Sequence, residues 1–202
     1  MSHNIEKIIY INLERRVDRL HEITEELTKF NLVGERFNAI PNSKGIVGCG
    51  YSHLEVLKIA KQRGYKNILI LEDDFTFLVP KEKLEEELTR LFEKEIPFDV
   101  CMLAYNLKES ETSVHGDFLK RVLSAQTASA YLVNSHYFDT LINLYNIAIP
   151  LLEKTERPQI YANDQVWKRL QRKDNWVCFT TRIGKQRASY SDNENKLVNY
   201  HC

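Results

Sequence analysis

One short segment constrains the fold more than any other part of the chain. Residues 66–71 read Lys-Asn-Ile-Leu-Ile-Leu, an almost uninterrupted apolar run. Such a run is typical of a strand in the middle of a parallel sheet, where helices cover both faces. Three carboxylates, Glu72, Asp73 and Asp74, follow this run directly. The sequence therefore predicts a buried strand with concentrated negative charge at its carboxyl end.

Strand and helix patterns alternate along the rest of the chain. In residues 15–30, Leu20, Ile23 and Leu27 recur at helical spacing after an apolar strand pattern at 6–13. The further predicted segments are strands at 36–40, 98–104, 119–124, 128–133 and 176–180, with 119–124 and 128–133 as a pair, helices at 52–63, 80–95, 135–147 and 163–172, and loops at 41–50 and 106–117. This alternation predicts an α/β fold in three layers, with a mostly parallel central sheet flanked by helices.

The length and the charge of the chain limit its number of domains and the ligands it can bind. The chain has 202 residues, and its 28 basic side chains balance 28 acidic ones. We therefore expect a single domain over residues 1–202 and no general affinity for nucleic acid, because that affinity requires a clustered excess of Lys and Arg. The balance is uneven, since residues 165–202 hold 8 basic and 3 acidic side chains. This excess would be either a solvated surface or a partner for an anionic ligand, and residues 181–202 are expected to be partly irregular.

The apolar runs and the cysteines indicate in which cellular compartment the protein is expected. The sequence has no apolar run of about 18 residues and no apolar leader near its start, so we expect no transmembrane segment and no signal peptide. The four cysteines, Cys49, Cys101, Cys178 and Cys202, lie far apart without a Cys-x-x-Cys spacing. That distribution favours free thiols in a reducing compartment, and therefore a cytoplasmic protein.

The three acids after residue 71 carry the most chemical information. Ligands of open α/β sheets bind beyond the carboxyl ends of the strands. Neighbouring carboxylates that stay ionised there need a cation, and a hard ion such as Mg²⁺ or Mn²⁺ would accept these oxygens together with water and substrate phosphates. The simpler interpretation is an acidic strand end that solubilises a turn or caps the next element. Alternation predicts that Glu72 and Asp74 point to one side and Asp73 to the other.

Six short segments, in order along the chain, carry a family resemblance. They are YINLERRVDR at 10–19, GCGYSHL at 48–54, ILILEDD at 68–74, TASAYLV at 127–133, NDQ at 163–165 and SD at 191–192. In sequence and spacing they resemble the motifs of the family 25 glycosyltransferases, which include bacterial lipooligosaccharide galactosyltransferases and the procollagen galactosyltransferase type. The resemblance spans nearly the whole chain.

The resemblance implies a single-domain GT-A type Rossmann-like fold and an activity. Such an enzyme transfers galactose or glucose from UDP-galactose or UDP-glucose, with inversion at the anomeric carbon. Residues 72–74 would be this chain's version of the family's Asp-x-Asp metal motif. Asp74 would be the main ligand of Mn²⁺ or Mg²⁺, and Glu72 would contact the ribose or a metal-bound water. His201 is a further candidate ligand, because GT-A enzymes often use a late histidine, although a frayed terminus is the plainer interpretation.

An inverting transfer also needs a base on the acceptor hydroxyl. Among the matched positions, Asp164 is the first candidate and Asp192 the second. Asp164 also stands at the start of a predicted helix, where an ordinary first-turn acid would stabilise that helix.

The remaining matched positions are candidates for the donor site. They are Asn12, Arg16, Arg19, His53, Lys185 and Arg187. The first three would follow the first strand, where nucleotide binding is expected, but the two arginines would otherwise make only surface ion pairs. His53 would contact the donor or be a buried, hydrogen-bonded side chain that orients its loop. The last two would contact the diphosphate from the C-terminal segment.

The acceptor and two alternative functions stay open. The connection at 41–47 is shorter than in many relatives and Gln126 replaces a family glycine, so the acceptor is defined only as a glycan or protein hydroxyl. The expected absence of a leader favours a bacterial or viral type over an animal secretory one. A metal-dependent phosphoryl or nucleotidyl transferase would also use adjacent carboxylates, although the sequence has no GxxxxGK[ST] loop. A non-catalytic relative would bind a nucleotide sugar without turnover.

Overall fold

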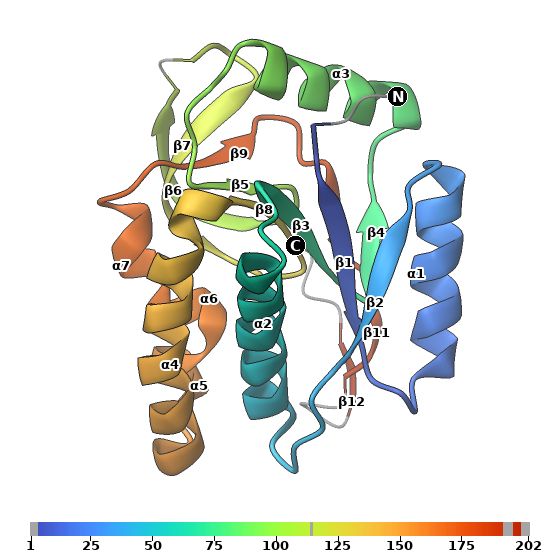
Figure 1. Cartoon of the computed structure of the whole chain (residues 1–202), viewed down its shortest axis with the longest axis vertical. Helices are drawn as coiled ribbons and strands as arrows, with labels where there is room; N and C mark the ends of the chain where they lie inside the picture. The colour runs from blue at the N-terminus through green and yellow to red at the C-terminus, as the bar shows by residue number, and fades with distance from the viewer. Residues whose placement is uncertain (1–3, 114, 192–195, 199–202) are drawn as a thin grey trace.

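An eight-stranded sheet forms the centre of the computed structural model, which describes residues 4–113, 115–191 and 196–198. The strand order is β2-β1-β3-β8-β5-β9-β7-β6 (Figure 1). Its members are β1 (Lys7–Asn12), β2 (Gly34–Asn38), β3 (Asn67–Glu72), β5 (Val100–Met102), β6 (Asn106–Thr112), β7 (Leu119–Gln126), β8 (Ala130–Asn134) and β9 (Trp176–Phe179). Only β8 and β7 run against their neighbours, so six of the eight strands point the same way. The predicted α/β fold with a mostly parallel sheet is confirmed.

Helices cover both faces of this sheet and complete the three predicted layers. On one face lie α2 and α4, and on the other lie α1 and α3 (Figure 1). Alternation along β1 explains the two faces, because Ile9 and Ile11 pack toward α2 while Ile8 and Tyr10 pack toward α1. The helices are α1 (Val17–Lys29), α2 (Gly45–Gln62), α3 (Lys81–Glu93), α4 (Phe138–Thr155), α5 (Pro158–Tyr161), α6 (Asn163–Val166) and α7 (Lys168–Gln171), with a 3-10 turn at Ser135–Tyr137.

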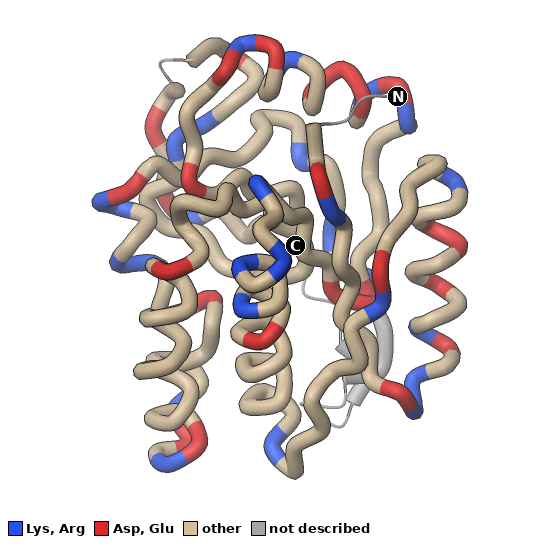
Figure 2. The backbone as a smooth tube through the Cα atoms, viewed as in Figure 1, with Lys and Arg blue, Asp and Glu red and all other residues tan. Residues whose placement is uncertain are grey.

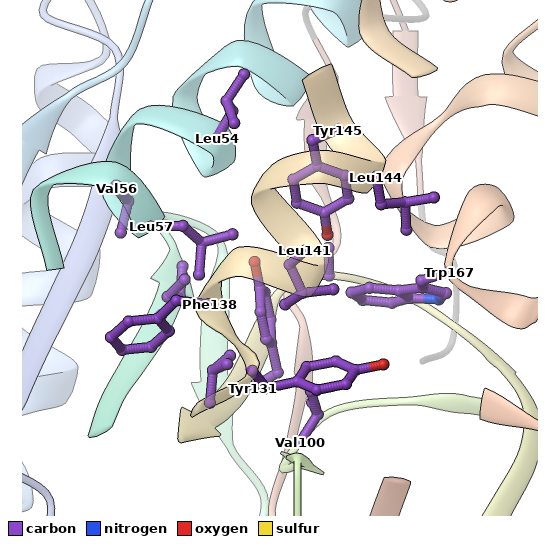
Figure 3. Packing of buried hydrophobic residues seen from close by; sticks show 14 of the residues in the cluster. Leu54, Val56, Leu57, Val100, Tyr131, Phe138, Leu141, Leu144, Tyr145 and Trp167 are labelled. Carbon is purple, nitrogen blue, oxygen red and sulfur yellow. The ribbon is translucent and has the colours of Figure 1, made fainter. Parts of the chain in front are cut away.

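The core between the sheet and α4 is rich in aromatic side chains. Tyr131 of β8 lies edge-on to Trp167, with ring centroids 5.5 Å apart, and Trp167 lies 5.1 Å from Trp176 of β9. Figure 3 shows Tyr131 and Trp167 beside Leu141 of α4. Each fully buried apolar side chain contributes roughly 1.5–3 kcal/mol. This packing fixes the ring of Tyr131, whose hydroxyl hydrogen-bonds with α2.

The second helix begins earlier than the sequence predicts. The glycines at 45–50 predict a loop and a helix only from residue 52, but α2 starts at Gly45. At Gly48 a Cβ atom would lie 2.5 Å from the carbonyl oxygen of Ile40, and at Gly50 it would lie 3.1 Å from Ile149 of α4. These glycines therefore permit close packing of a helix and do not mark a loop. Gly64 does end the helix as expected, with a φ of 69°.

The predicted loop at 106–117 contains a strand. Residues 106–112 form β6, which pairs with β7 at the edge of the sheet. Its sequence is polar because an edge strand faces solvent, and Glu111 pairs with Arg121 of β7 at 2.8 Å. The expected pairing of segments 119–124 and 128–133 is wrong, since β5 and β9 lie between β7 and β8. The predicted helix at 163–172 is divided at Trp167 into α6 and α7.

The described part of the C-terminal segment contains three short strands. Within it, β10 (Gly184–Gln186) pairs with β4 (Phe75–Phe77), and β11 (Ser189–Ser191) pairs with β12 (Lys196–Val198). A Cβ atom on Gly184 would collide with the ring of Phe75. The close β4–β10 contact places residues 184–187 beside the acidic turn that precedes β4.

Candidate functional site

The carboxyl ends of β1 and β3 meet at one edge of the sheet. Ile11 of β1 is in register with Glu72 of β3, so Asn12 and Glu72 end neighbouring parallel strands. Asp73 and Asp74 form the turn that leads into β4. The acids therefore lie at the carboxyl end of a buried strand, as the sequence predicts, and this is the edge where α/β sheets bind ligands.

Asp73 is held by two polar side chains from the end of β1 and the start of α1. Its Oδ2 accepts a hydrogen bond from Asn12 Nδ2 at 2.8 Å, and its Oδ1 accepts one from Arg19 Nη1 at 2.9 Å. Asn12 is 1% exposed and Asp73 is 7% exposed. Burial raises the pKa of Asp73, although the charge of Arg19 opposes the shift. These charge-assisted bonds join α1 to the acidic turn.

Asp74 has a strongly perturbed carboxyl group. Its Oδ2 accepts a hydrogen bond from Arg19 Nη1 at 3.2 Å and lies 3.5 Å from Gln186 Nε2. Its Oδ1 is buried and has no hydrogen-bond partner among the described residues. Burial and the charge of Glu72 raise the pKa of Asp74 to about 7, against the opposing effect of Arg19. A buried, unpartnered carboxylate oxygen fits a bound cation.

Glu72 points toward α2. Its Oε1 lies 3.1 Å from His53 Nε2 and 3.5 Å from Cys49 Sγ, and its Oε2 lies 3.4 Å from Gln186 Nε2. Burial raises the pKa of Glu72, but the contacts with His53 and Cys49 and the charge of Arg19 together outweigh burial and lower the pKa. His53 is fully buried, and its Nδ1 lies 2.9 Å from the Tyr131 hydroxyl. Of the two predicted interpretations of His53, the buried, hydrogen-bonded histidine is what the contacts describe.

The predicted alternation of the three acids holds only in part. Gln186 approaches both Glu72 and Asp74, as expected for side chains on one side. Arg19, however, donates to both Asp73 and Asp74. The reason is that β3 ends at Glu72 and the next two residues turn, so strand alternation no longer applies.

Asp164 lies at the start of α6 and faces the connection between β7 and β8. Its Oδ2 accepts the backbone N–H of Thr127 at 3.1 Å, and its Oδ1 accepts Gln165 Nε2 at 3.2 Å. Thr127 has a φ of 83°, a left-handed conformation that a β-branched residue adopts only under constraint. Burial raises the pKa of Asp164, and the charge of Glu72 adds to the rise while the two hydrogen bonds oppose it. Asp164 therefore combines a structural contact with an electrostatic coupling to the acidic turn.

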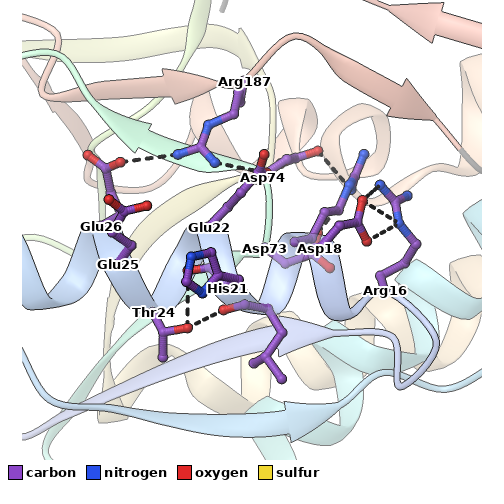
Figure 4. Close-up of polar contacts among 12 residues, drawn as sticks. Arg16, Asp18, His21, Glu22, Thr24, Glu25, Glu26, Asp73, Asp74 and Arg187 are labelled. Atoms are coloured by element: carbon purple, nitrogen blue, oxygen red, sulfur yellow. Dashed lines mark hydrogen bonds and ion pairs between the residues drawn. The ribbon is translucent and has the colours of Figure 1, made fainter.

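Arg187 forms ion pairs with two glutamates of α1. Its Nη1 lies 2.8 Å from Glu22 Oε2, and its Nη2 lies 3.1 Å from Glu26 Oε2 (Figure 4). Its backbone N–H donates to the carbonyl oxygen of Asp74 at 2.6 Å. The guanidinium group of Arg187 is thus an ion-pair partner of α1, and the predicted contact with a diphosphate would have to compete with two glutamates.

The other predicted cations differ in their surroundings. The guanidinium of Arg16 contacts Asp18, with Nη2 and Oδ2 2.8 Å apart, which matches a surface ion pair. Because side chains alternate along β10 and Gln186 reaches the acids, Lys185 lies on the opposite face of that strand. Two further predicted site residues, Asp192 and His201, lie outside the described residues.

Charges of both signs are interspersed over the helices (Figure 2). Part of the basic excess after residue 165 is compensated by acids elsewhere in the chain, since Arg172 pairs with Glu109 and Arg187 with Glu22 and Glu26. This pairing favours a local polar site and argues against a broad cationic surface.

Three residues join the site without a predicted role: Cys49, Tyr131 and Gln186. A signal for Cys49 exists in the sequence, because Cys49 and His53 are four residues apart on one helix and therefore share a face. Gln186 has no local signal, since β10 has only three residues and its partner β4 is distant in sequence.

Similar folds occur among solved structures. The protein A197 from STIV aligns over 96% of this chain and 93% of its own length, with a TM-score of 0.51 and 12% identity. A Drosophila β1,4-galactosyltransferase 7 mutant, solved in complex with manganese, UDP-Gal and xylobiose, aligns over 96% of this chain and 74% of its own, with a TM-score of 0.50 and 11% identity. This chain has a GT-A type fold.

A third similar structure is a glycosyltransferase involved in the glycosylation of the major capsid of PBCV-1, with a TM-score of 0.49 and 8% identity over 94% of this chain and 95% of its own. No family model and no curated protein sequence matches the chain. Across the described residues, no helix has both the length and the apolar character needed to cross a membrane.

Proposed function

We propose that this chain is a glycosyltransferase that moves a hexose, galactose or glucose, from a UDP-sugar to a hydroxyl of a glycan or protein, with inversion and with the help of a divalent ion. The observation that carries the proposal is the acidic turn at 72–74, in which Asp73 and Asp74 are buried, at the carboxyl end of β3 in a GT-A fold. The galactosyltransferase of similar fold binds manganese and UDP-Gal in its crystal structure. The family 25 resemblance supports the same chemistry.

Mn²⁺ or Mg²⁺ fits the oxygen atoms of the acidic turn. Asp74 Oδ1 is buried without a partner among the described residues, and Gln186 links Asp74 to Glu72. Hard cations prefer carboxylate oxygens. Asp74 would hold the ion, Glu72 would contact a metal-bound water or the ribose, and His201 remains a proposed further ligand. When bound, the ion would stabilise the negative charge that develops on the departing UDP.

The donor nucleotide would lie over the carboxyl ends of β1 and β3. Asn12 and Arg19 hold Asp73 through hydrogen bonds of 2.8 and 2.9 Å, which supports a role in positioning the acidic turn beneath the donor. Arg16, the residue before α1, would approach the phosphates after leaving its exposed partner Asp18. Exposed ion pairs of that kind are worth about 1 kcal/mol or less, so a diphosphate can displace them.

The other proposed donor contacts act over a longer range or through a neighbour. His53 is fully buried and would position Glu72 through their 3.1 Å contact. Arg187 would support the turn through its backbone bond to Asp74. Lys185 is half-buried on β10 and would add positive charge near the diphosphate.

Asp164 is the proposed base. Its raised pKa makes this carboxylate a stronger proton acceptor than an ordinary aspartate, and each of its oxygens retains a lone pair beyond the one used by Thr127 or Gln165. The proton would pass from the acceptor hydroxyl to this carboxylate as the hydroxyl oxygen attacks the anomeric carbon. Asp192 is the alternative base.

One observation favours a second candidate, a relative that binds a nucleotide sugar without transferring it. Arg19 donates to both Asp73 and Asp74, so part of the positive charge expected from a metal is already supplied by the protein. Such a protein would bind the donor without a divalent ion.

Incubation of the purified protein with UDP-galactose or UDP-glucose, Mn²⁺ or Mg²⁺ and a panel of glycan acceptors tests the proposal. We expect metal-dependent UDP release that falls roughly 100-fold in Asp74→Asn. Asp139→Asn is the matched control, because it removes an exposed carboxylate that pairs with Lys61. Thermal stabilisation by a UDP-sugar without metal and without UDP release would favour the second candidate. No response to any UDP-sugar would refute both.

A further inference from the structure

Cys49, His53 and Glu72 bring a thiol, an imidazole and a carboxylate to one point. Cys49 and His53 lie one turn apart on α2, and Glu72 ends β3. One ligand atom from each residue lies within 4.8 Å of the other two. The cluster therefore combines three different ligand types from two elements that the sheet and helix layers press together.

The spacing of these atoms suits a tetrahedral ion. Zinc binds sulfur at about 2.3 Å, imidazole nitrogen at about 2.0–2.1 Å and carboxylate oxygen at about 2.0–2.2 Å, so its ligand atoms are about 3.3–3.8 Å apart. In the cluster, His53 Nε2 and Glu72 Oε1 are 3.1 Å apart, and Cys49 Sγ and Glu72 Oε1 are 3.5 Å apart. Only small side-chain adjustments are needed to close the three groups around an ion.

Outer hydrogen bonds orient two of the three groups. His53 Nδ1 lies 2.9 Å from the hydroxyl of Tyr131, which leaves Nε2 directed at Glu72. The ring of Tyr131 is fixed against Trp167. Gln186 Nε2 donates to Glu72 Oε2 at 3.4 Å, which leaves Oε1 for the cluster. Metal-binding histidines and carboxylates are normally held by contacts of this kind.

Two of the three residues in the cluster are partly exposed. His53 is fully buried, but Cys49 is half-buried and the side chain of Glu72 is 18% exposed. An entering ion would therefore approach from the side of Cys49 and Glu72, where a fourth coordination position would remain for water.

We propose that Cys49, His53 and Glu72 form a binding site for Zn²⁺, separate from the hard-ion site at Asp74. Thiolate and imidazole ligands select zinc over Mg²⁺ and Mn²⁺. Binding releases the thiol proton of Cys49 to solvent, requires the neutral imidazole of His53 to carry its proton on Nδ1, which can donate to the Tyr131 hydroxyl, and forms bonds to Sγ, Nε2 and Oε1. Because Glu72 also belongs to the donor site, zinc inhibits sugar transfer. This inhibition rests on the proposed function, whereas zinc binding does not.

Cobalt is the spectroscopic probe for this site. The untagged full chain, kept reduced, is titrated with Co²⁺ and its absorbance is recorded. We expect a thiolate-to-cobalt charge-transfer band and the strong visible bands of tetrahedral cobalt, all abolished by one equivalent of Zn²⁺ and unaffected by excess Mg²⁺. Cys49→Ser should lose the charge-transfer band and bind zinc roughly tenfold or more weakly. Cys101→Ala, which removes another buried thiol, should keep the band.

Each outcome decides a separate point. Absence of the band in the wild-type chain, or its persistence in Cys49→Ser, would overturn the zinc site. Circular dichroism of both variants reports whether they fold, and the wild-type titration stands even if a variant does not. Inhibition of UDP release by zinc, relative to each variant's own rate, tests the second step. A cobalt band without any UDP-sugar turnover would leave the zinc site standing and refute the transferase proposal.

Discussion

Asp164 accepts the backbone amide of Thr127 at 3.1 Å, and Thr127 is held at a φ of 83°. A β-branched residue in this left-handed conformation stores strain of about 1–3 kcal/mol. The carboxylate therefore stabilises the strained connection between β7 and β8, and the same group is the proposed base. The two roles respond differently to substitution.

Asp164→Asn separates these roles, because asparagine keeps an oxygen for the Thr127 amide but loses the proton acceptor. We expect the Tm to change by less than about 3 °C and sugar transfer to fall roughly 100-fold or more. Asp164→Ala removes both functions and should also cost about 1–3 kcal/mol of stability. Scanning fluorimetry and UDP release on the same preparations measure both effects.

Gln165→Ala is the control for Asp164. It removes the 3.2 Å contact to Asp164 Oδ1 and leaves the carboxylate in place, so transfer should persist. Near-normal transfer by Asp164→Asn would show that Asp164 is not the base and would turn attention to Asp192.

Because of Asp74, the free energy of unfolding should fall as the pH rises. Its pKa is about 7 in the folded chain against an ordinary value of 3.8. Between these values the folded chain holds a proton that the unfolded chain has lost, so the free energy of unfolding decreases as pH rises through the window. The raised pKa values of Asp73 and Asp164 act in the same direction. Without divalent ions, we expect a Tm roughly 3–8 °C higher near pH 5.5 than near pH 8.

The Asp74→Asn variant checks this assignment. Asparagine stays neutral at every pH, so the dependence of Tm on pH should flatten and the Tm near pH 8 should rise. A pH dependence as steep as that of the wild type would mean that other groups cause it.

A divalent ion should restore stability where the proton is lost. At about 100 times its Kd, an ion that binds only the folded chain adds about 2.7 kcal/mol. The rise in Tm with Mn²⁺ should be larger near pH 8 than near pH 5.5, because the ion competes with the proton on Asp74. Thermal melts of Asp139→Asn should show the same rise, and those of Asp74→Asn should not.

Arg187→Gln should destabilise the protein more than loss of an exposed ion pair. The side chain of Glu26 is 9% exposed and depends on Arg187 and on the backbone amide of Phe77. Removal of the guanidinium leaves this buried carboxylate poorly compensated, at a cost of about 1–3 kcal/mol. Lys61→Gln breaks a pair whose side chains are 55% and 60% exposed and should cost less than about 1 kcal/mol. If urea unfolding gives equally small losses for Arg187→Gln and Lys61→Gln, the ion pair of Arg187 with Glu26 contributes little to stability. The guanidinium would then be free to make the predicted contact with the diphosphate.

Gly48→Ala should damage the fold at the start of α2. The added Cβ would lie 2.5 Å from the Ile40 carbonyl oxygen, and backbone atoms cannot rotate away. We expect a loss of about 2–3 kcal/mol in urea unfolding. Gly64→Ala is the comparison, since its added Cβ meets no atom within 4 Å. Its only expected loss of stability, about 1 kcal/mol, comes from placing alanine at a φ of 69°. Equal losses for the two variants would show that α2 shifts freely at Gly48.

The short polar elements could not be predicted from local patterns. Residues 106–112 show little alternation of apolar and polar side chains and few apolar side chains at all. They form a strand only because their backbone pairs with β7. The pairing of Thr76 with Lys185 joins segments from opposite halves of the chain. In the glycine-rich run before Tyr51, packing space and not backbone freedom explains Gly48 and Gly50. Pattern reasoning has no access to any of these tertiary partners.

Local patterns in the chain were enough to predict the buried strand β3, the acidic turn after it and the α/β layering, because apolar periodicity is a local property that burial enforces. Arg19 joins Asp73 to Asp74, and Glu72 turns instead toward His53 and Cys49, through contacts that exist only in the folded chain. Those contacts depend on strand order and on where the chain leaves the strand at Glu72. Side chains distant in sequence meet there because the sheet and its helices pack in one arrangement.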